Sequence, residues 1–423
     1  MVSAYLPGLL TQAATTVTTA TTAATPKMLL YIGIGLIVLI TIIVITIVSR
    51  NAAKVSSPST VKTVIRDRTA LLNATIEPTA GKKKSIYEMP LPEDQSLLLN
   101  YQPISCRLAG YLDPLQDGAF AEADAVRLGL AAGARLFILE ISRGSDERPV
   151  LVARDSMGYK RSLNNGSIQK VCENLVNKTD EPLILVLYIH DAPDKTKNPE
   201  AYLSFLSQIA KALEPIIPQH IGLTSVGDFT RQKKENELFA FSPNFYKGKI
   251  IVLCNADTSG FRDPARLGVK RTFSPKEDLD FFVHARLYKG EGGGDLGITE
   301  AASSAGTGTA AKVQIVSDSY FLLTPPDKVS SAINTTRNTF TIVMKKDPTF
   351  SPSDKVTDIL YKTYGVQSIP LPLSVLATRS ATATASWTPK DIPLRFVKPK
   401  PVIPTVPNPQ LDAKHGVVVA PKL

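Results

Sequence analysis

The segment from Met28 to Ser49 contains twenty-two consecutive residues without a formal charge, and Lys27 and Arg50 bracket it. At ~1.5 Å rise per residue, a helix of this length measures about 33 Å, enough to cross the ~30 Å hydrocarbon core of a bilayer. A helix packed on a globular core carries a polar stripe, whereas this segment is apolar on every side. It therefore predicts a transmembrane helix over residues 28–49.

Two other interpretations of this segment fit less well. A buried core helix would show the polar stripe that is missing here. A cleaved signal peptide has a basic region before a shorter apolar core and a small-residue cleavage site after it. Residues 1–26 carry no charged side chain, and no such cleavage pattern follows Arg50. We therefore expect an anchor that stays in the mature chain.

Basic residues flank the predicted span unevenly. Residues 1–27 form an uncharged Thr/Ala-rich segment up to Lys27, whereas the span is followed by Arg50, Lys54 and the cluster Lys82, Lys83 and Lys84. Cytoplasmic flanks of membrane helices carry the excess of Lys and Arg, so the N-terminus is expected across the membrane and the large C-terminal part on the cytoplasmic side. The three cysteines (Cys106, Cys172 and Cys254) are isolated in sequence, which agrees with a reducing compartment.

The chain carries a net charge of +10, and part of this excess lies between residues 50 and 84. A polybasic linker beside a membrane predicts attraction to anionic lipid head groups. A solvated topology signal explains the same charge, and the sequence leaves both explanations open. The chain has no aromatic RNA-binding motif, Cys/His finger or basic heptad helix, so nucleic acid is not an expected partner.

The rest of the chain is expected to contain a linker, one large domain and a tail. Residues 50–94 are polar and basic and predict a linker, and residues 95–397 alternate between helical and strand patterns. Strands are predicted at 135–141, 149–153, 183–189, 249–254, 281–287, 339–344 and 365–369. Helices are predicted at 119–130, 167–176, 199–213 and 353–361. Strands that are apolar on both faces and alternate with helices predict a parallel α/β sheet, and their number favours a closed β/α (TIM) barrel.

Two segments interrupt or follow this alternation. A Gly-rich insertion covers about residues 290–312 and includes the sequence GEGGGDLG. It lacks the lysine and hydroxyl residue of a phosphate-binding loop, so a flexible insertion is the expected interpretation. Residues 398–423 form a Pro-rich tail, which predicts an extended segment that is either disordered or laid along a partner.

Several motifs in the large domain resemble a known barrel family. The segments are AAGAR at residues 131–135, ERPVLV at 147–152, DEPLILVLYIH at 180–190 and YGVQSIP at 364–370. Their order resembles the catalytic barrel of phosphoinositide-specific phospholipase C. More closely, it resembles the phospholipase-C-like barrel proteins of large nucleocytoplasmic DNA viruses. The resemblance covers roughly residues 95–400 and implies a phospholipase-C-like TIM barrel.

The resemblance also implies a catalytic site that this chain lacks in large part. Family members use two histidines at the scissile phosphodiester, with nearby carboxylates that often hold calcium. Here the segment Cys106–Leu112 has no histidine, and Ala153 stands where the second one is expected. Glu140 remains of a carboxylate pair, and Tyr188 replaces a strand glutamate.

The candidate residues of a vestigial pocket are Glu140, Asp155, Tyr188 and His190. His190 is expected to be a strand-end histidine with satisfied hydrogen bonds rather than a catalyst. No cofactor or metal ion is expected.

The favoured hypothesis is a non-catalytic minor capsid protein that links an internal viral membrane to the capsid shell, with the bilayer and the major and other minor capsid proteins as partners. The alternatives are a membrane-tethered phosphodiesterase using His190, Glu140 and Asp155, and a module that binds phospholipid head groups.

Overall fold

The computed structural model describes residues 31–42, 57–113, 117–221, 238–289 and 313–397. The predicted segments 290–312 and 398–423, and the flanking residues Lys27, Arg50 and Lys54, lie outside these ranges. Residues 31–42 are helical and their large apolar side chains are exposed, but both ends of the predicted span 28–49 fall outside the described residues. No helix within the described ranges is both long and apolar enough to cross a bilayer.

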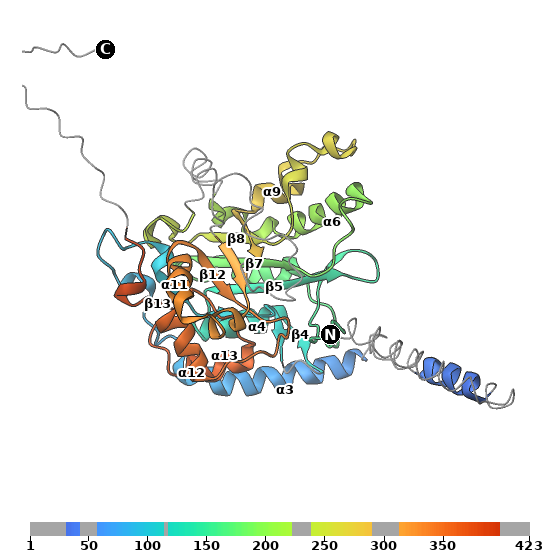
Figure 1. Ribbon diagram of the computed structural model, residues 1–423, viewed down its shortest axis with the longest axis horizontal. Helices are drawn as coiled ribbons and strands as arrows, with labels where there is room; N and C mark the ends of the chain where they lie inside the picture. Colours follow the sequence, from blue (N-terminus) through green and yellow to red (C-terminus); the bar gives the residue numbers. More distant parts are fainter. Residues whose placement is uncertain (1–30, 43–56, 114–116, 222–237, 290–312, 398–423) are drawn as a thin grey trace, which may run out of the picture.

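Parallel strands form the centre of the molecule (Figure 1). One sheet has the order β2, β5, β7, β8 and β9, and a second has the order β10, β11 and β12. Their bounds are Ser105–Cys106 (β2), Leu136–Arg143 (β5), Leu183–Ile189 (β7), Ile250–Cys254 (β8), Ala285–Arg286 (β9), Tyr288–Lys289 (β10), Val313–Val316 (β11) and Phe340–Val343 (β12). The predicted parallel α/β sheet is therefore confirmed.

Short contacts join the two sheets into a ring. Only Leu287 separates β9 from β10 along the chain, so one strand runs through both sheets with a break at this residue. On the other side, Ser368 forms a parallel bridge with Ile342 of β12, and Leu371 forms one with Cys106 of β2. Residues 368–371 thus occupy the place of the last strand, and the arrangement is that of a β/α barrel.

The strands are apolar on both faces because two separate cores cover them. Every second strand side chain points to the inside, where the ring encloses a first core that includes Ile138, Val186, Leu253, Ile315 and Ile342. The intervening side chains point outwards to the helices and build a second core that includes Leu139, Leu187, Val252, Val316 and Val343. This alternation positions inward-facing polar residues where the strands end.

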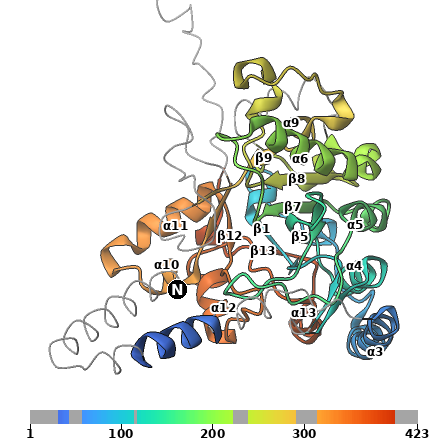
Figure 2. The ribbon, with the colours of Figure 1, turned by 90° about the vertical axis from the view of Figure 1, so that its right-hand side faces the viewer.

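Helices surround the ring, and Figure 2 shows α4, α5 and α6 stacked along one side of it. The α-helices are α3 (Pro58–Ile76), α4 (Glu122–Ala131), α5 (Ile168–Leu175), α6 (Pro199–Ala212), α9 (Leu279–Phe282), α10 (Asp318–Leu322), α11 (Val329–Asn338), α12 (Asp354–Asp358) and α13 (Leu373–Ser380). A π-helix over Ile359–Thr363 continues α12 directly. Two antiparallel pairs complete the fold, β1 (Tyr101–Pro103) with β13 (Trp387–Pro389) and β3 (Tyr111–Leu112) with β4 (Ala119–Phe120).

The predicted linker 50–94 is wrong from residue 57 onwards. The Ser57 side chain caps α3, which packs along α4 and α13 and buries Leu72 and Ile76. Further on, the Lys84 amide donates to the Thr384 carbonyl, so this part of the chain is fixed to the barrel. Most of α3 faces solvent, and a helix with so few buried positions has a weak apolar pattern. For this reason the polar composition of residues 58–76 predicts a linker and not a packed helix.

Three smaller predictions also need correction. The predicted strand 281–287 begins as the end of helix α9, and only Ala285–Arg286 pair in the sheet. The strand at 149–153 is β6 (Pro149–Leu151), which pairs antiparallel with the end of β5 and is not part of the parallel ring. The chain is also not a free stalk at the cluster Lys82, Lys83 and Lys84, because the Lys83 stem lies against Gly133 and burial lowers its pKa, whereas Lys82 and Lys84 are exposed.

The packing of α3 can be tested with two neighbouring leucines. The Leu72 side chain is 4 % exposed, whereas Leu71 is 59 % exposed. We expect Leu72→Ala to lower the free energy of unfolding by about 2–5 kcal/mol through the lost apolar contacts and the cavity left behind. The matched control Leu71→Ala should change it by less than about 0.5 kcal/mol. Urea denaturation followed by circular dichroism measures both, and equal effects would show that α3 is not docked.

Candidate functional site at the carboxyl end of the barrel

The carboxyl ends of parallel strands meet at one edge of the barrel, which we call the mouth, and β/α barrels carry their functional residues there. Glu140 lies in β5 two residues after the inward-facing Ile138, so its side chain also points inwards. Tyr188 of β7 is its register partner across the sheet. His190 follows β7 directly, which places it at the mouth beside Glu140.

An ion pair between Arg107 and Glu140, together with a hydrogen bond between Glu140 and His190, forms a network that we call the mouth latch. Arg107 Nε donates to Glu140 Oε1 at 2.5 Å. The second carboxylate oxygen, Oε2, lies 2.7 Å from His190 Nε2. The Arg107 and Glu140 side chains are each 1 % exposed, whereas His190 is 21 % exposed. Both oxygens of the Glu140 carboxylate are therefore bonded within the protein.

The remaining Arg107 donors bind backbone carbonyls beyond β12. Nη1 donates to the Lys345 and Asp347 carbonyls, at 2.8 Å each, and Nη2 lies 3.4 Å from the Lys346 carbonyl. The guanidinium thereby ties the end of β2 to the ends of β5 and β12, and His190 adds the end of β7. Because its donors already have partners, Arg107 has little capacity left to bind an anionic ligand.

The electrostatics of the latch favour a charged Glu140. Burial by itself would raise the pKa of this carboxyl, but the Arg107 charge and the His190 hydrogen bond outweigh it and hold the pKa at about 2. A buried carboxylate without such partners would be strongly unfavourable. The pair is therefore interdependent, since each charge is compatible with burial only in the presence of the other.

The Tyr188 ring packs against the latch at His190. Its ring is edge-on to the His190 imidazole, with the ring centroids 4.6 Å apart. Burial, and next the Glu140 charge, raises the pKa of the phenol far above its ordinary value, so the hydroxyl stays neutral at physiological pH. The neutral phenol therefore adds no second negative charge beside Glu140.

The structure does not bring Asp155 into the latch. Its carboxylate accepts hydrogen bonds from the Met157 and Tyr159 amides and pairs with Arg161 at 2.5 Å. These partners all lie within the loop that follows β6. Asp155 therefore organises its own turn, and the predicted grouping with Glu140 and His190 is not found among the described contacts.

The residue after Arg107 has a strained backbone. Leu108 has a φ of 54°, in the left-handed region that leucine rarely adopts, and it is buried. The turn is held because the next residue, Ala109, donates its amide to the Ile138 carbonyl at 2.8 Å. Such strain persists only where surrounding contacts over-determine the conformation. The contacts of the latch supply that constraint.

The donor set at the mouth does not fit the calcium ion that the resemblance implies. Calcium takes six to eight oxygen ligands, usually including several carboxylates. Within the described ranges, no group of three or more His, Cys, Asp or Glu side chains is arranged to hold a metal ion. Glu140 is the inward-facing carboxylate of the latch, and Arg107 and His190 occupy both of its oxygens.

Other charged residues near the strand ends are also paired with one another. Lys195 Nζ lies 2.5 Å from Asp257 beyond β8, and Arg286 of β9 lies 3.5 Å from the same carboxylate. Lys345 pairs with Asp318 at 3.1 Å. In these pairs, charged side chains near the strand ends bind one another within the protein. Such contacts restrict the motion of the loops at the mouth.

Comparisons with known proteins find similar folds at low identity. No family model matches the chain, and no curated protein does. PLC21 of L. pealei has a TM-score of 0.47 at 12 % identity, covering 72 % of this chain and 38 % of its own length. The Ca²⁺-dependent phosphatidylinositol-specific phospholipase C of Streptomyces antibioticus has 0.42 at 13 %, covering 70 % and 99 %. A putative glycerophosphoryl diester phosphodiesterase from Silicibacter pomeroyi has 0.36 at 12 %, covering 66 % and 93 %.

These structures are distantly similar to the chain in fold, as phospholipase-C-like α/β proteins with a parallel sheet. The chain spans less than two fifths of the length of the L. pealei protein, 38 %.

Arg107, the central residue of the latch, is not among the residues that the sequence motifs single out. The segment Cys106–Leu112 stands out in the motif pattern only because it has no histidine. The available signal was a single charged residue inside the otherwise uncharged segment from Tyr101 to Leu112. A charge in such a setting is normally buried with a partner, and Glu140 was the other isolated charge in an apolar strand.

A double-mutant cycle tests the interdependence of the latch. Arg107→Met and Glu140→Met should each lower the free energy of unfolding by about 3–5 kcal/mol, because each removes one member of the buried Arg107–Glu140 ion pair. The double variant should lose clearly less than the sum of the two, since neither charge remains. Denaturant titrations of the four proteins measure this coupling, and additive losses would contradict it.

The latch also predicts an acid dependence of stability. The pKa of Glu140 falls from 4.5 to about 2 on folding, so its stabilising effect is complete above the unfolded value and is lost as the pH falls towards the folded one. The difference in unfolding free energy between the wild type and Glu140→Gln should therefore shrink below pH 4.5. The exposed Glu93→Gln is the control. A difference independent of pH would contradict the charged state of Glu140.

Proposed function

We propose that this chain is a non-catalytic, membrane-tethered scaffold. In its concrete form it is a minor capsid component that links an internal viral membrane to the capsid shell through its phospholipase-C-like barrel. The observation that carries the proposal is the mouth latch. Arg107, Glu140 and His190 bind one another at the place where such barrels bind their substrates.

The latch is poorly suited to phosphodiester chemistry. Cleavage needs a general base and a general acid in reach of the phosphate, each contributing ~10²–10⁴-fold to the rate. Of the latch residues and Tyr188, only His190 is partly exposed, and it is already bonded to Glu140. The inward-facing arginine that could bind a phosphate is bonded to Glu140 and to backbone carbonyls.

The position of α3 supports a short tether. If residues 28–49 cross the bilayer, only the eight residues from Arg50 to Ser57 separate the span from Pro58, where α3 begins. Eight extended residues reach at most about 28 Å. Since α3 is packed on α4 and α13, the barrel is held close to the membrane surface, on the side that the charge asymmetry assigns to the cytoplasm.

The virion setting is supported by the sequence resemblance to barrel proteins of large DNA viruses. A protein fixed to the membrane at one end can contact the capsid with its outer surface. The Gly-rich composition of residues 290–312 and the Pro-rich composition of residues 398–423 suit segments that contact neighbouring proteins. The proposed partners are the bilayer, with its anionic head groups, and the major and other minor capsid proteins.

One observation favours a second candidate function. His190 is partly exposed and its Nε2 lies 2.7 Å from Glu140, the arrangement of a histidine base oriented by a carboxylate. A membrane-tethered phosphodiesterase could use this pair. A head-group-binding module that has lost catalysis is a third possibility, and both differ from the scaffold in requiring a ligand at the mouth.

An activity measurement separates the scaffold from the enzyme. We expect the full chain in lipid nanodiscs to hydrolyse neither phosphatidylinositol nor a glycerophosphodiester above background, with or without calcium, because acid and base groups are missing. His190→Ala should be indistinguishable from the wild type. Hydrolysis that is lost in His190→Ala and kept in the control His415→Ala, in the C-terminal tail, would establish the enzyme instead.

A localisation measurement tests the scaffold itself. Purified virions should retain the chain at a defined copy number after soluble proteins are washed off. Cryo-electron microscopy should then show its density between the membrane and the major capsid layer. Presence in membranes of infected cells but not in virions would refute the capsid assignment.

A further inference from the structure

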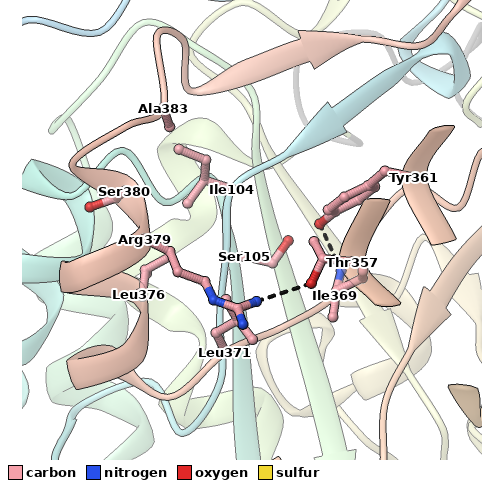
Figure 3. A pocket seen from close by; sticks show the side chains of 10 residues that line it. All are labelled: Ile104, Ser105, Thr357, Tyr361, Ile369, Leu371, Leu376, Arg379, Ser380 and Ala383. Carbon is pink, nitrogen blue, oxygen red and sulfur yellow. Dashed lines mark hydrogen bonds between the residues drawn. The ribbon is translucent and has the colours of Figure 1, made fainter. Parts of the chain in front are cut away.

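A cavity of about 150 Å³ lies between the barrel wall and the helices α12 and α13 (Figure 3). One wall is the start of β2 and the closing segment of the barrel, with Ile104, Ile369 and Leu371. The opposite wall comes from α13 and the residues after it, with Leu376 and Ala383. The cavity is separate from the mouth latch, since none of the latch residues lines it.

The cavity is mainly apolar but has a cationic group at its centre. Figure 3 shows Arg379 reaching from α13 across the space to Thr357 of α12. Its Nη1 donates to Thr357 Oγ1 at 3.1 Å, and its Nη2 donates to the Pro352 carbonyl. Its carboxylate neighbour is Asp354, 3.5 Å away with a side chain that is 96 % exposed. An ion pair with a fully solvated partner is weak.

The π-helix over Ile359–Thr363 supplies the remaining polar group. Short π-helical segments are rare and are often found at functional sites. This one directs Tyr361 into the cavity, where its hydroxyl oxygen accepts the Ile369 amide at 3.2 Å. Burial raises the pKa of Tyr361 to about 12, so the hydroxyl keeps its hydrogen as a donor. Within the described ranges, no acceptor is bonded to that hydrogen.

The size and the chemistry of the cavity together specify one class of ligand. An apolar cavity of ~150 Å³ accommodates about six carbon atoms, as small hydrocarbons do in engineered cavities. A weakly paired guanidinium beside apolar walls is complementary to an anion with an alkyl chain. We propose that this cavity binds a short aliphatic monocarboxylate, with the alkyl chain against Ile104, Leu371 and Leu376 and the carboxylate on Arg379.

In the bound state the carboxylate replaces Asp354 as the partner of Arg379. Because Asp354 is exposed, its release into solvent costs little. The Tyr361 hydroxyl serves as a second donor on the α12 side of the cavity. The site thus selects for a negative charge through Arg379 and for an apolar chain through the apolar side chains of its walls.

Hexanoate is a suitable probe because it is fully ionised near neutral pH and has six carbons. Saturation-transfer NMR on the full chain in nanodiscs should give a saturable signal for hexanoate. Ala383→Leu, which fills the cavity, should weaken that binding at least tenfold. The matched control Ala381→Leu changes an exposed alanine in the same segment and should bind as the wild type does.

The charge requirement is tested separately. Arg379→Gln should weaken hexanoate binding at least tenfold, whereas Arg379→Lys should retain part of it, because a positive charge remains. Thermal unfolding of each variant shows whether it is folded. If the wild type gives no more signal than Ala383→Leu, the cavity does not bind the acid. If Arg379→Gln binds hexanoate as tightly as the wild type, the carboxylate is not recognised by Arg379. Either result overturns the proposal.

Discussion

The buried ion pair between Arg107 and Glu140 is the interaction on which the organisation of the barrel mouth depends. Both side chains are almost fully buried, and neither charge is compatible with that burial alone. Their hydrogen bonds join the ends of β2 and β5 and reach the backbone beyond β12, and His190 adds β7. Strands that are far apart in sequence are thereby fixed to one another at the edge where related folds leave room for a ligand.

This pairing explains how charged side chains can lie at inward-facing positions of the mouth. In β/α barrels the strand ends at this edge carry the functional residues. A charge buried there without a partner would destabilise the protein. Pairing Glu140 with an arginine satisfies the carboxylate from within. The Arg107 guanidinium also donates hydrogen bonds to three backbone carbonyls, which would otherwise need water molecules as partners.

The two apolar layers of the barrel differ in how completely side chains fill them. The inner layer is filled by alternating large side chains from every long strand. The outer layer leaves a cavity where α12 passes into a π-helix beside α13. Tyr361 of the π-helix is one of the residues that line this cavity. The latch at the mouth and the cavity at the wall therefore lie in different layers of one fold.

Local periodicity alone predicts the parallel α/β class, the positions of β5, β7 and β8, and the helices α5 and α6. The sequence also shows that no histidine precedes His190. Only the tertiary structure decided that residues 58–94 belong to the barrel and that Arg107, not Asp155, completes the site with Glu140 and His190. The physical reason is that Arg107 and Glu140 are far apart in sequence, and a long-range ion pair has no local pattern. Its existence depends on the register that places the ends of β2, β5 and β7 side by side.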